Sequence, residues 1–89
     1  MKPQLTERAL RHLAVIEQYI AADNPEVALR EVDRILKTIG LLEQNPYLGR
    51  ASELRRRREL VIAPYIAIYR VRRDASVEVV AIRHGAQNR

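Results

Sequence analysis

The residues best suited to a functional site are arginines and one histidine in the second half of the chain. They are Arg55, Arg56, Arg57, Arg58, Arg70, Arg83 and His84. A histidine beside guanidinium groups could act as the acid or base of RNA cleavage, with arginine stabilising the charge that develops on phosphorus. The same arginines could instead bind an anionic partner, because the guanidinium fork makes two-point contacts with carboxylate or phosphate. The residue types alone leave both interpretations open.

Each of these residues also has a plain structural interpretation. His84 could cap a strand, since no second acid–base group accompanies it. The arginine run could be a solvated surface, and in an extended segment alternate arginines would point to opposite sides. Tyr65 and Tyr69 could stack on bases, but on one strand they are more typical of a core. His12 lies among polar helix residues, and we expect it at the surface.

The positive charge is concentrated in one half of the chain. Residues 1–49 carry six Lys or Arg against seven Asp or Glu, whereas residues 50–89 carry ten Arg against four acids. A basic half beside a nearly neutral half indicates an anionic partner, such as nucleic acid, an enzyme that works on nucleic acid, or an acidic polypeptide. Because all ten basic residues of this half are arginine, recognition is favoured over simple solubility.

Several other kinds of site find no support in the sequence. The chain has no cysteine, its two histidines form no metal motif, and its three glycines lie far apart. We therefore expect no metal, no cofactor and no phosphate-binding glycine loop. An apolar signal region and a stretch of roughly 20 apolar residues are also missing, so we expect a soluble cytoplasmic protein of one domain over residues 1–89 without a membrane partner.

The first half predicts two helices that must pack on whatever follows. Thr6 is a good N-cap for a helix over residues 6–22, whose apolar stripe includes Leu10, Leu13 and Ile20. Asn24-Pro25 begins a second helix over residues 25–45. Its predicted buried face comprises Ala28, Val32, Ile35, Leu36, Ile39 and Leu42. The short connection makes the pair an antiparallel hairpin.

The second half predicts a small antiparallel sheet. Residues 57–63, 65–72 and 76–84 are rich in β-branched residues and tyrosine and read as three strands, with a possible edge strand over residues 2–5. In the last strand, Val77, Val79, Ala81 and Arg83 should face one way, and Glu78, Val80, Ile82 and His84 the other. Both faces are largely apolar, and the hairpin can cover only one. The other face is either small and curled or receives a partner.

The chain resembles the RelE/ParE superfamily of type II toxin–antitoxin toxins. The resemblance rests on Leu5-Thr6-Glu7-Arg8-Ala9, Asn45-Pro46-Tyr47-Leu48-Gly49-Arg50, Pro64 to Val71 and Arg83-His84-Gly85-Ala86, taken in order. It covers essentially the whole chain and is closest to the ParE branch. It implies an α+β fold, with an N-terminal antiparallel helical hairpin on an antiparallel sheet of three to four strands. It also implies a cognate ParD-like antitoxin with an acidic, amphipathic tail.

The resemblance implies two different activities. ParE-type toxins inhibit DNA gyrase and arrest growth without being enzymes, whereas RelE-type toxins cleave mRNA on the ribosome. The nuclease branch usually has an arginine three residues before the tyrosine of the middle strand, and here that position is Ile66. The resemblance therefore favours the gyrase inhibitor. The alternatives are a nuclease using Arg58, Arg70, Arg83 and His84, or a non-toxic module that only binds an antitoxin.

Overall fold

In the computed structural model, which describes residues 1–85, two helices pack on one five-stranded sheet. The helices are α1 (Glu7–Ala21) and α2 (Pro25–Gly40), followed by the 3-10 turn η1 (Leu41–Glu43). The strands are β1 (Gln4–Leu5), β2 (Arg50–Ala51), β3 (Arg58–Ile62), β4 (Tyr65–Val71) and β5 (Val77–His84). The sheet order is β1-β5-β4-β3-β2, with β1 parallel to β5 and every other pair antiparallel.

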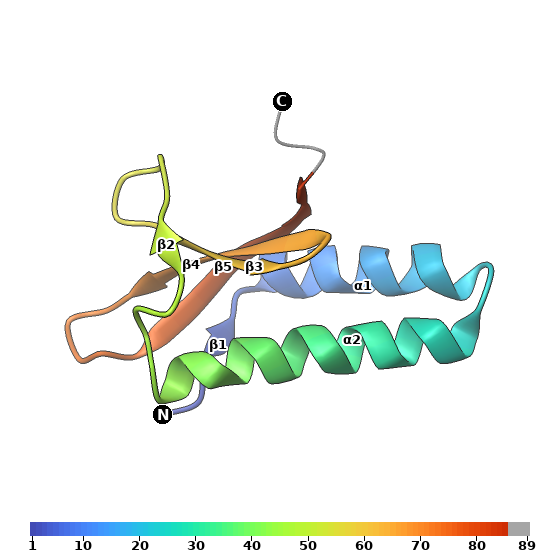
Figure 1. Cartoon of the computed structure of the whole chain (residues 1–89), viewed down its shortest axis with the longest axis horizontal. Coiled ribbons are helices and arrows are strands. Elements are labelled where there is room, and N and C mark those ends of the chain that lie inside the picture. Colours follow the sequence, from blue (N-terminus) through green and yellow to red (C-terminus); the bar gives the residue numbers. More distant parts are fainter. Residues whose placement is uncertain (86–89) are drawn as a thin grey trace.

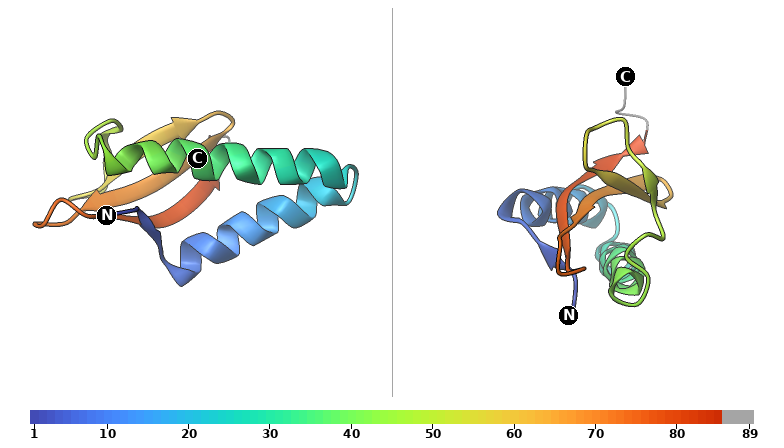
Figure 2. Two further views of the ribbon diagram at one scale, coloured as in Figure 1. Left: turned by 90° about the horizontal axis from the view of Figure 1, so that it is seen from below. Right: turned by 90° about the vertical axis from the view of Figure 1, so that its left-hand side faces the viewer.

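This architecture confirms the predicted α+β class and corrects the strand number. Besides the three predicted strands, the possible edge strand over residues 2–5 is present as β1, and the unexpected strand β2 brings the sheet to five. Because β1 runs parallel to β5, the sheet is mixed and not purely antiparallel as predicted. The helices lie side by side on one face, and the tip of their hairpin extends past the sheet (Figure 1). Seen from the helical side, α2 crosses in front of the strands (Figure 2). We call this side of the sheet the helix face and the opposite side the outer face.

The helix boundaries follow from local capping. The Thr6 side chain accepts a hydrogen bond from the Ala9 amide, and the Asn24 side chain accepts one from the Val27 amide. The second helix is shorter than predicted, because its α-helical hydrogen bonding ends at Gly40 and the chain tightens into η1, which keeps Leu42 fully buried. Capping signals thus located the starts of both helices better than the end of α2.

The main core lies between the helices and the helix face. Ala9 and Leu13 of α1 and Ile35 and Ile39 of α2 meet a larger set of sheet residues: Leu60, Ile62, Tyr65, Ala67, Tyr69, Val77, Val79 and Ile82. Two predicted core residues are wrong, since Leu10 is 53% exposed and Leu36 is 42% exposed. The helices bury a narrower stripe than their apolar residues allow, because the small sheet covers only part of each helix.

A β-bulge in β5 reverses the predicted alternation of its second half. Ile68 of β4 pairs with Ala81, but the next residue, Tyr69, pairs with Val79, so Val80 is the extra residue. Upstream of Val80 the prediction holds, with Val77 and Val79 in the helix-face core. Downstream, the two faces are exchanged. Ile82 and His84 lie on the helix face opposite Ala67 and Tyr65, whereas Ala81 and Arg83 lie on the outer face opposite Ile68 and Ile66.

The segment between η1 and β2 is fixed to the sheet by Tyr69. Its hydroxyl donates to the Pro46 carbonyl at 2.8 Å and accepts from the Gly49 amide at 2.9 Å, and its ring is fully buried. Gly49 does not have a positive φ. It is needed for space, because a Cβ there would stand 2.5 Å from the Glu59 carbonyl oxygen and 2.8 Å from the Tyr69 ring.

None of the described helices is both long enough and apolar enough to cross a lipid bilayer.

Replacing Gly49 by alanine should destabilise the protein, because neither the β3 backbone nor the buried Tyr69 ring can move freely. We expect a loss of about 1–3 kcal/mol in the free energy of unfolding, the usual cost of overpacking. Gly40→Ala is the matched control, since a Cβ there meets nothing within 4 Å and lies in a helix. That change should stabilise by up to about 1 kcal/mol. Urea unfolding followed by circular dichroism measures both, and equal midpoints would contradict the steric account.

Candidate functional site

The predicted site residues divide between the two faces of the sheet. Arg70 and Arg83 lie on the outer face, opposite Glu78 and Ile66 in the strand pairing. Arg58 pairs with Tyr69 and His84 pairs with Tyr65, so both belong to the helix face. Along β4 these partners are four residues apart, which separates Arg58 from His84 by roughly 13 Å in the strand direction, and the two residues lie on opposite sides of β4. The four residues proposed for a nuclease therefore do not form one cluster.

On the outer face, two glutamates each hold two arginines. Glu59 accepts from Arg50 at 3.1 Å and from Arg83 at 3.2 Å, and its side chain is 12% exposed. Between these charges lies a small buried apolar cluster of Ile66, Ile68 and Ala81. This face is the small alternative considered from the sequence, since these residues are buried although no helix covers them.

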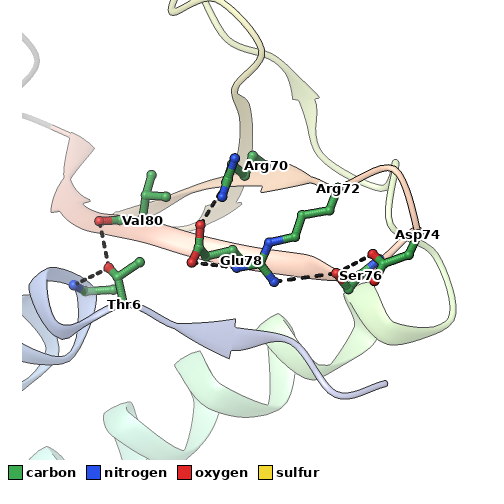
Figure 3. Close-up of polar contacts among 8 residues, drawn as sticks. Thr6, Arg70, Arg72, Asp74, Ser76, Glu78 and Val80 are labelled. Atoms are coloured by element: carbon green, nitrogen blue, oxygen red, sulfur yellow. Dashed lines mark hydrogen bonds and ion pairs between the residues drawn. The ribbon is translucent and has the colours of Figure 1, made fainter.

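The second of these glutamates, Glu78, joins β4, β5 and the turn between them. It accepts from Arg70 and from Arg72, both at 2.7 Å, and Asp74 accepts from the Ser76 amide and hydroxyl within the same turn (Figure 3). The hydrogen bond from Arg70 is the main reason that the pKa of Glu78 lies below its usual value. Arg70 is therefore already neutralised, which reduces its capacity to bind an external anion.

Arg58 holds the Asn45–Arg50 segment in place. Its guanidinium donates to the backbone carbonyls of Tyr47 and Gly49, and it lies 5.2 Å from the centre of the Tyr47 ring. The side chain thus fixes the same segment that Tyr69 fixes from the core. This role is structural and explains why the fourth arginine of the run differs from the other three.

The remaining arginines occupy a turn, and Arg57 belongs to this turn although the predicted strand began there. Ser52 donates its amide to the Arg57 carbonyl at 3.0 Å, and the Arg57 amide donates to the Leu54 carbonyl at 3.1 Å. Arg56 adopts a φ of 59°, in the left-handed region that bulky residues seldom occupy. Arg55 and Arg56 are exposed and form no ion pair within residues 1–85. We call residues 52–57 the arginine turn.

On the helix face, a groove of about 720 Å³ lies beside α1 and the end of β5. Val15 and Tyr19 contribute exposed apolar surface to it, 63% and 83% exposed respectively. Tyr65 and His84 meet in it edge to face, with ring centres 5.7 Å apart. An amphipathic segment of a partner protein fits such a surface.

His12 contributes to this groove, although its sequence context indicates a surface residue. Instead of lying free at the surface, His12 is half-buried, and its Nδ1 accepts a hydrogen bond from the Ile82 amide at 3.1 Å. Burial, together with the charges of Arg8 and Arg11, lowers its pKa below 6.5. No local pattern could have identified this contact, because it joins residues 70 positions apart.

A helical hairpin packs on one face of this mixed sheet, and the arginine turn lies at the opposite end of the sheet from the apolar groove. A family described as the ParE toxin of the type II toxin–antitoxin system parDE matches residues 4–89. The chain belongs to this ParE toxin family.

Individual relatives agree with this assignment. The chain is 43% identical over 84 residues to "Putative toxin Y4kP" of Sinorhizobium fredii, covering 92% of this chain and 85% of that protein. It is 35% identical over 82 residues to "Toxin RelE2" of Caulobacter vibrioides, covering 92% of each. A solved structure described as a chromosomal ParDE TA system from P. aeruginosa superposes with a TM-score of 0.83 at 28% identity, covering 94% of this chain and 95% of that one.

The Glu78 contacts predict a specific acid sensitivity. Because the pKa of Glu78 is lowered in the folded protein, its contribution to stability is complete above the unfolded value of 4.5 and disappears as the pH falls below it. Glu78→Gln should therefore unfold with a shallower pH dependence between about pH 5 and pH 3 than the parent protein. The control is Glu53→Gln, an exposed carboxylate without an ion pair in residues 1–85. Thermal unfolding across this range decides; parallel curves for all three proteins would refute the assignment.

Proposed function

We propose that this toxin acts in the cytoplasm by binding and inhibiting DNA gyrase, and that a cognate antitoxin with an acidic, amphipathic tail neutralises it. The observation that carries the proposal is the separation of the candidate nuclease residues. His84 lies on the helix face, Arg70 and Arg83 lie on the outer face, and both arginines are paired with glutamates. RNA cleavage needs an acid–base group and cations around one phosphate, and this arrangement does not bring them together.

The position of Ile66 supports the same proposal. This residue stands where the nuclease branch has its arginine, and it lies 8% exposed in the apolar cluster of the outer face. Arg83, which lies opposite Ile66 in the strand pairing, is itself held by Glu59. Inhibition by surface binding does not require a phosphate to reach Arg83.

A ribosome-dependent mRNA nuclease is the second candidate, and one relative favours it. The 35% identical protein of Caulobacter vibrioides is named a RelE toxin. In addition, Nη1 of Arg83 is buried and makes no hydrogen bond within the described part of the chain. Such a donor is available for a phosphate oxygen if Glu59 releases the side chain.

Induced expression of the lone toxin, with pulse labelling of DNA and protein synthesis, separates the two activities. Gyrase inhibition stops DNA synthesis first while translation continues, and purified toxin then blocks gyrase supercoiling in vitro. Early arrest of translation, with cuts in ribosome-bound mRNA that disappear in Arg83→Ala and His84→Ala, would establish the nuclease instead. Unchanged growth and labelling would refute both activities and leave an antitoxin-binding module.

For the antitoxin, the structure offers two chemically different surfaces. The groove beside α1 supplies apolar contacts, and the arginine turn supplies positive charge that forms no ion pair within residues 1–85. An acidic, amphipathic tail can use both, with aliphatic residues in the groove and carboxylates on Arg55, Arg56 and Arg57. The charged part of the affinity should weaken with salt, whereas the apolar part should not.

Reversing the charge of the arginine turn tests the charged part. Arg55→Glu combined with Arg56→Glu should weaken antitoxin binding about tenfold at low salt, with the difference disappearing near about 1 M salt. Lys2→Glu combined with Arg30→Glu is the matched control, because it changes net charge equally at two exposed positions elsewhere. Titration calorimetry at several salt concentrations measures both variants. Equal weakening by the two pairs would mean that only net charge matters.

A further inference from the structure

The edge of β5 is only partly covered by β1. The two strands pair at Gln4 with Glu78 and at Leu5 with Val79, and no further. The chain then turns into α1 at Thr6, whose amide donates to the Val79 carbonyl at 3.0 Å. The Thr6 hydroxyl donates to the Val80 carbonyl at 3.2 Å (Figure 3). Beyond Val80 the edge has no strand neighbour on this side in residues 1–85.

His12 occupies this uncovered edge. His12 lies in the second turn of α1, beyond the N-cap Thr6. Its Nδ1 accepts a hydrogen bond from the Ile82 amide. A side-chain nitrogen therefore takes the place that a backbone carbonyl of a further strand would fill. An uncovered edge amide attracts other strands, and a side-chain acceptor is one way to satisfy it.

The surroundings of His12 are apolar and cationic. From its own helix it is faced by Arg8 and Arg11, and the groove around it also contains Tyr19 of α1, Tyr65 of β4 and His84 of β5. Arg83 also lines this groove, but its guanidinium group pairs with Glu59 on the outer face. None of the described residues that line the groove is acidic. A segment that enters it must therefore be apolar where it meets Val15 and Ile16, and it gains from carboxylates near the arginines.

We propose that His12 is a removable plug of the β5 edge, and that an extended segment of the antitoxin displaces it by placing a backbone carbonyl on the Ile82 amide. The occupant is an extended peptide with alternating apolar residues for the groove and at least one acidic side chain for Arg8 or Arg11. This inference rests on the proposed antitoxin. It goes beyond that proposal by assigning a strand-pairing contact and the residue that must move before the contact can form.

Displacement of the plug is coupled to a proton. In the free toxin Nδ1 is an acceptor, so it carries no proton, and a protonated ring would have to leave the Ile82 amide. Burial and the two arginines keep the pKa of His12 below 6.5, and release into solvent raises it towards that value. Antitoxin binding therefore takes up a proton, and by linkage its affinity rises as the pH falls from about 7.5 to about 5.5.

The free toxin provides the first test. His12→Ala removes the acceptor, whereas His12→Asn keeps an oxygen in the position of Nδ1 and cannot titrate. Amide hydrogen exchange of Ile82 should accelerate roughly tenfold in His12→Ala and stay near the parent rate in His12→Asn. Lowering the pH to about 5.5 should reduce protection in the parent toxin relative to His12→Asn. Equal protection of Ile82 in all three proteins would overturn the plug.

The second test uses the toxin–antitoxin complex obtained by co-expression. Ile82 should be protected equally in complexes of the parent and of His12→Ala, because the antitoxin now supplies the acceptor. Removing the plug should tighten binding about fivefold near about pH 7.5, the equivalent of one ordinary hydrogen bond. The increase in affinity on acidification should occur with the parent toxin and not with His12→Asn. Because both toxins bind the same antitoxin, comparing them removes the pH dependence that comes from the antitoxin itself.

Two outcomes overturn the inference. Weaker binding by His12→Ala that His12→Asn restores would make His12 a direct antitoxin contact. Rapid exchange of Ile82 in the His12→Ala complex would place the antitoxin elsewhere. Neither measurement involves gyrase or RNA, so the inference can fail while the proposed target stands, and the target can fail while the plug stands.

Discussion

The position of the arginine turn depends on the two hydrogen bonds of the buried Tyr69 hydroxyl. The ring fills the core between the helices and the sheet, and the hydroxyl holds both the Pro46 carbonyl and the Gly49 amide. These bonds bring Arg50 and Ala51 alongside β3 as a fifth strand. The arginine turn begins where that strand ends, so its exposed guanidinium groups owe their position to a phenol in the core.

The bulge at Val80 determines which residues meet at the other end. Without the extra residue, strict alternation would place Arg83 on the helix face and Ile82 on the outer face. With it, Arg83 reaches Glu59 on the outer face, and His84 meets Tyr65 in the groove. The two neighbouring residues thus serve different surfaces, one polar and paired, the other apolar and open to a partner.

Local signals in the sequence predicted the elements, and long-range pairing determined the site. Thr6 and Asn24-Pro25 predict the starts of the helices, because a helix cap involves only residues that are close together in the sequence. The direction of Arg83 depends on a bulge that only the β4–β5 register reveals. Likewise, the roles of Arg58 and His12 come from the carbonyl of Gly49 and the amide of Ile82, and no periodicity in the sequence carries that information.

The parallel pairing of β1 with β5 constrains the order in which the sheet of this toxin can form during synthesis. Gln4 emerges from the ribosome 74 residues before its partner Glu78, an interval of roughly 4–15 s at ordinary rates of translation. Throughout that interval β1 has no strand to pair with, and the groove beside α1 lacks its β5 side. The toxin can therefore close its sheet at β1 and complete this groove only after β5 has been made.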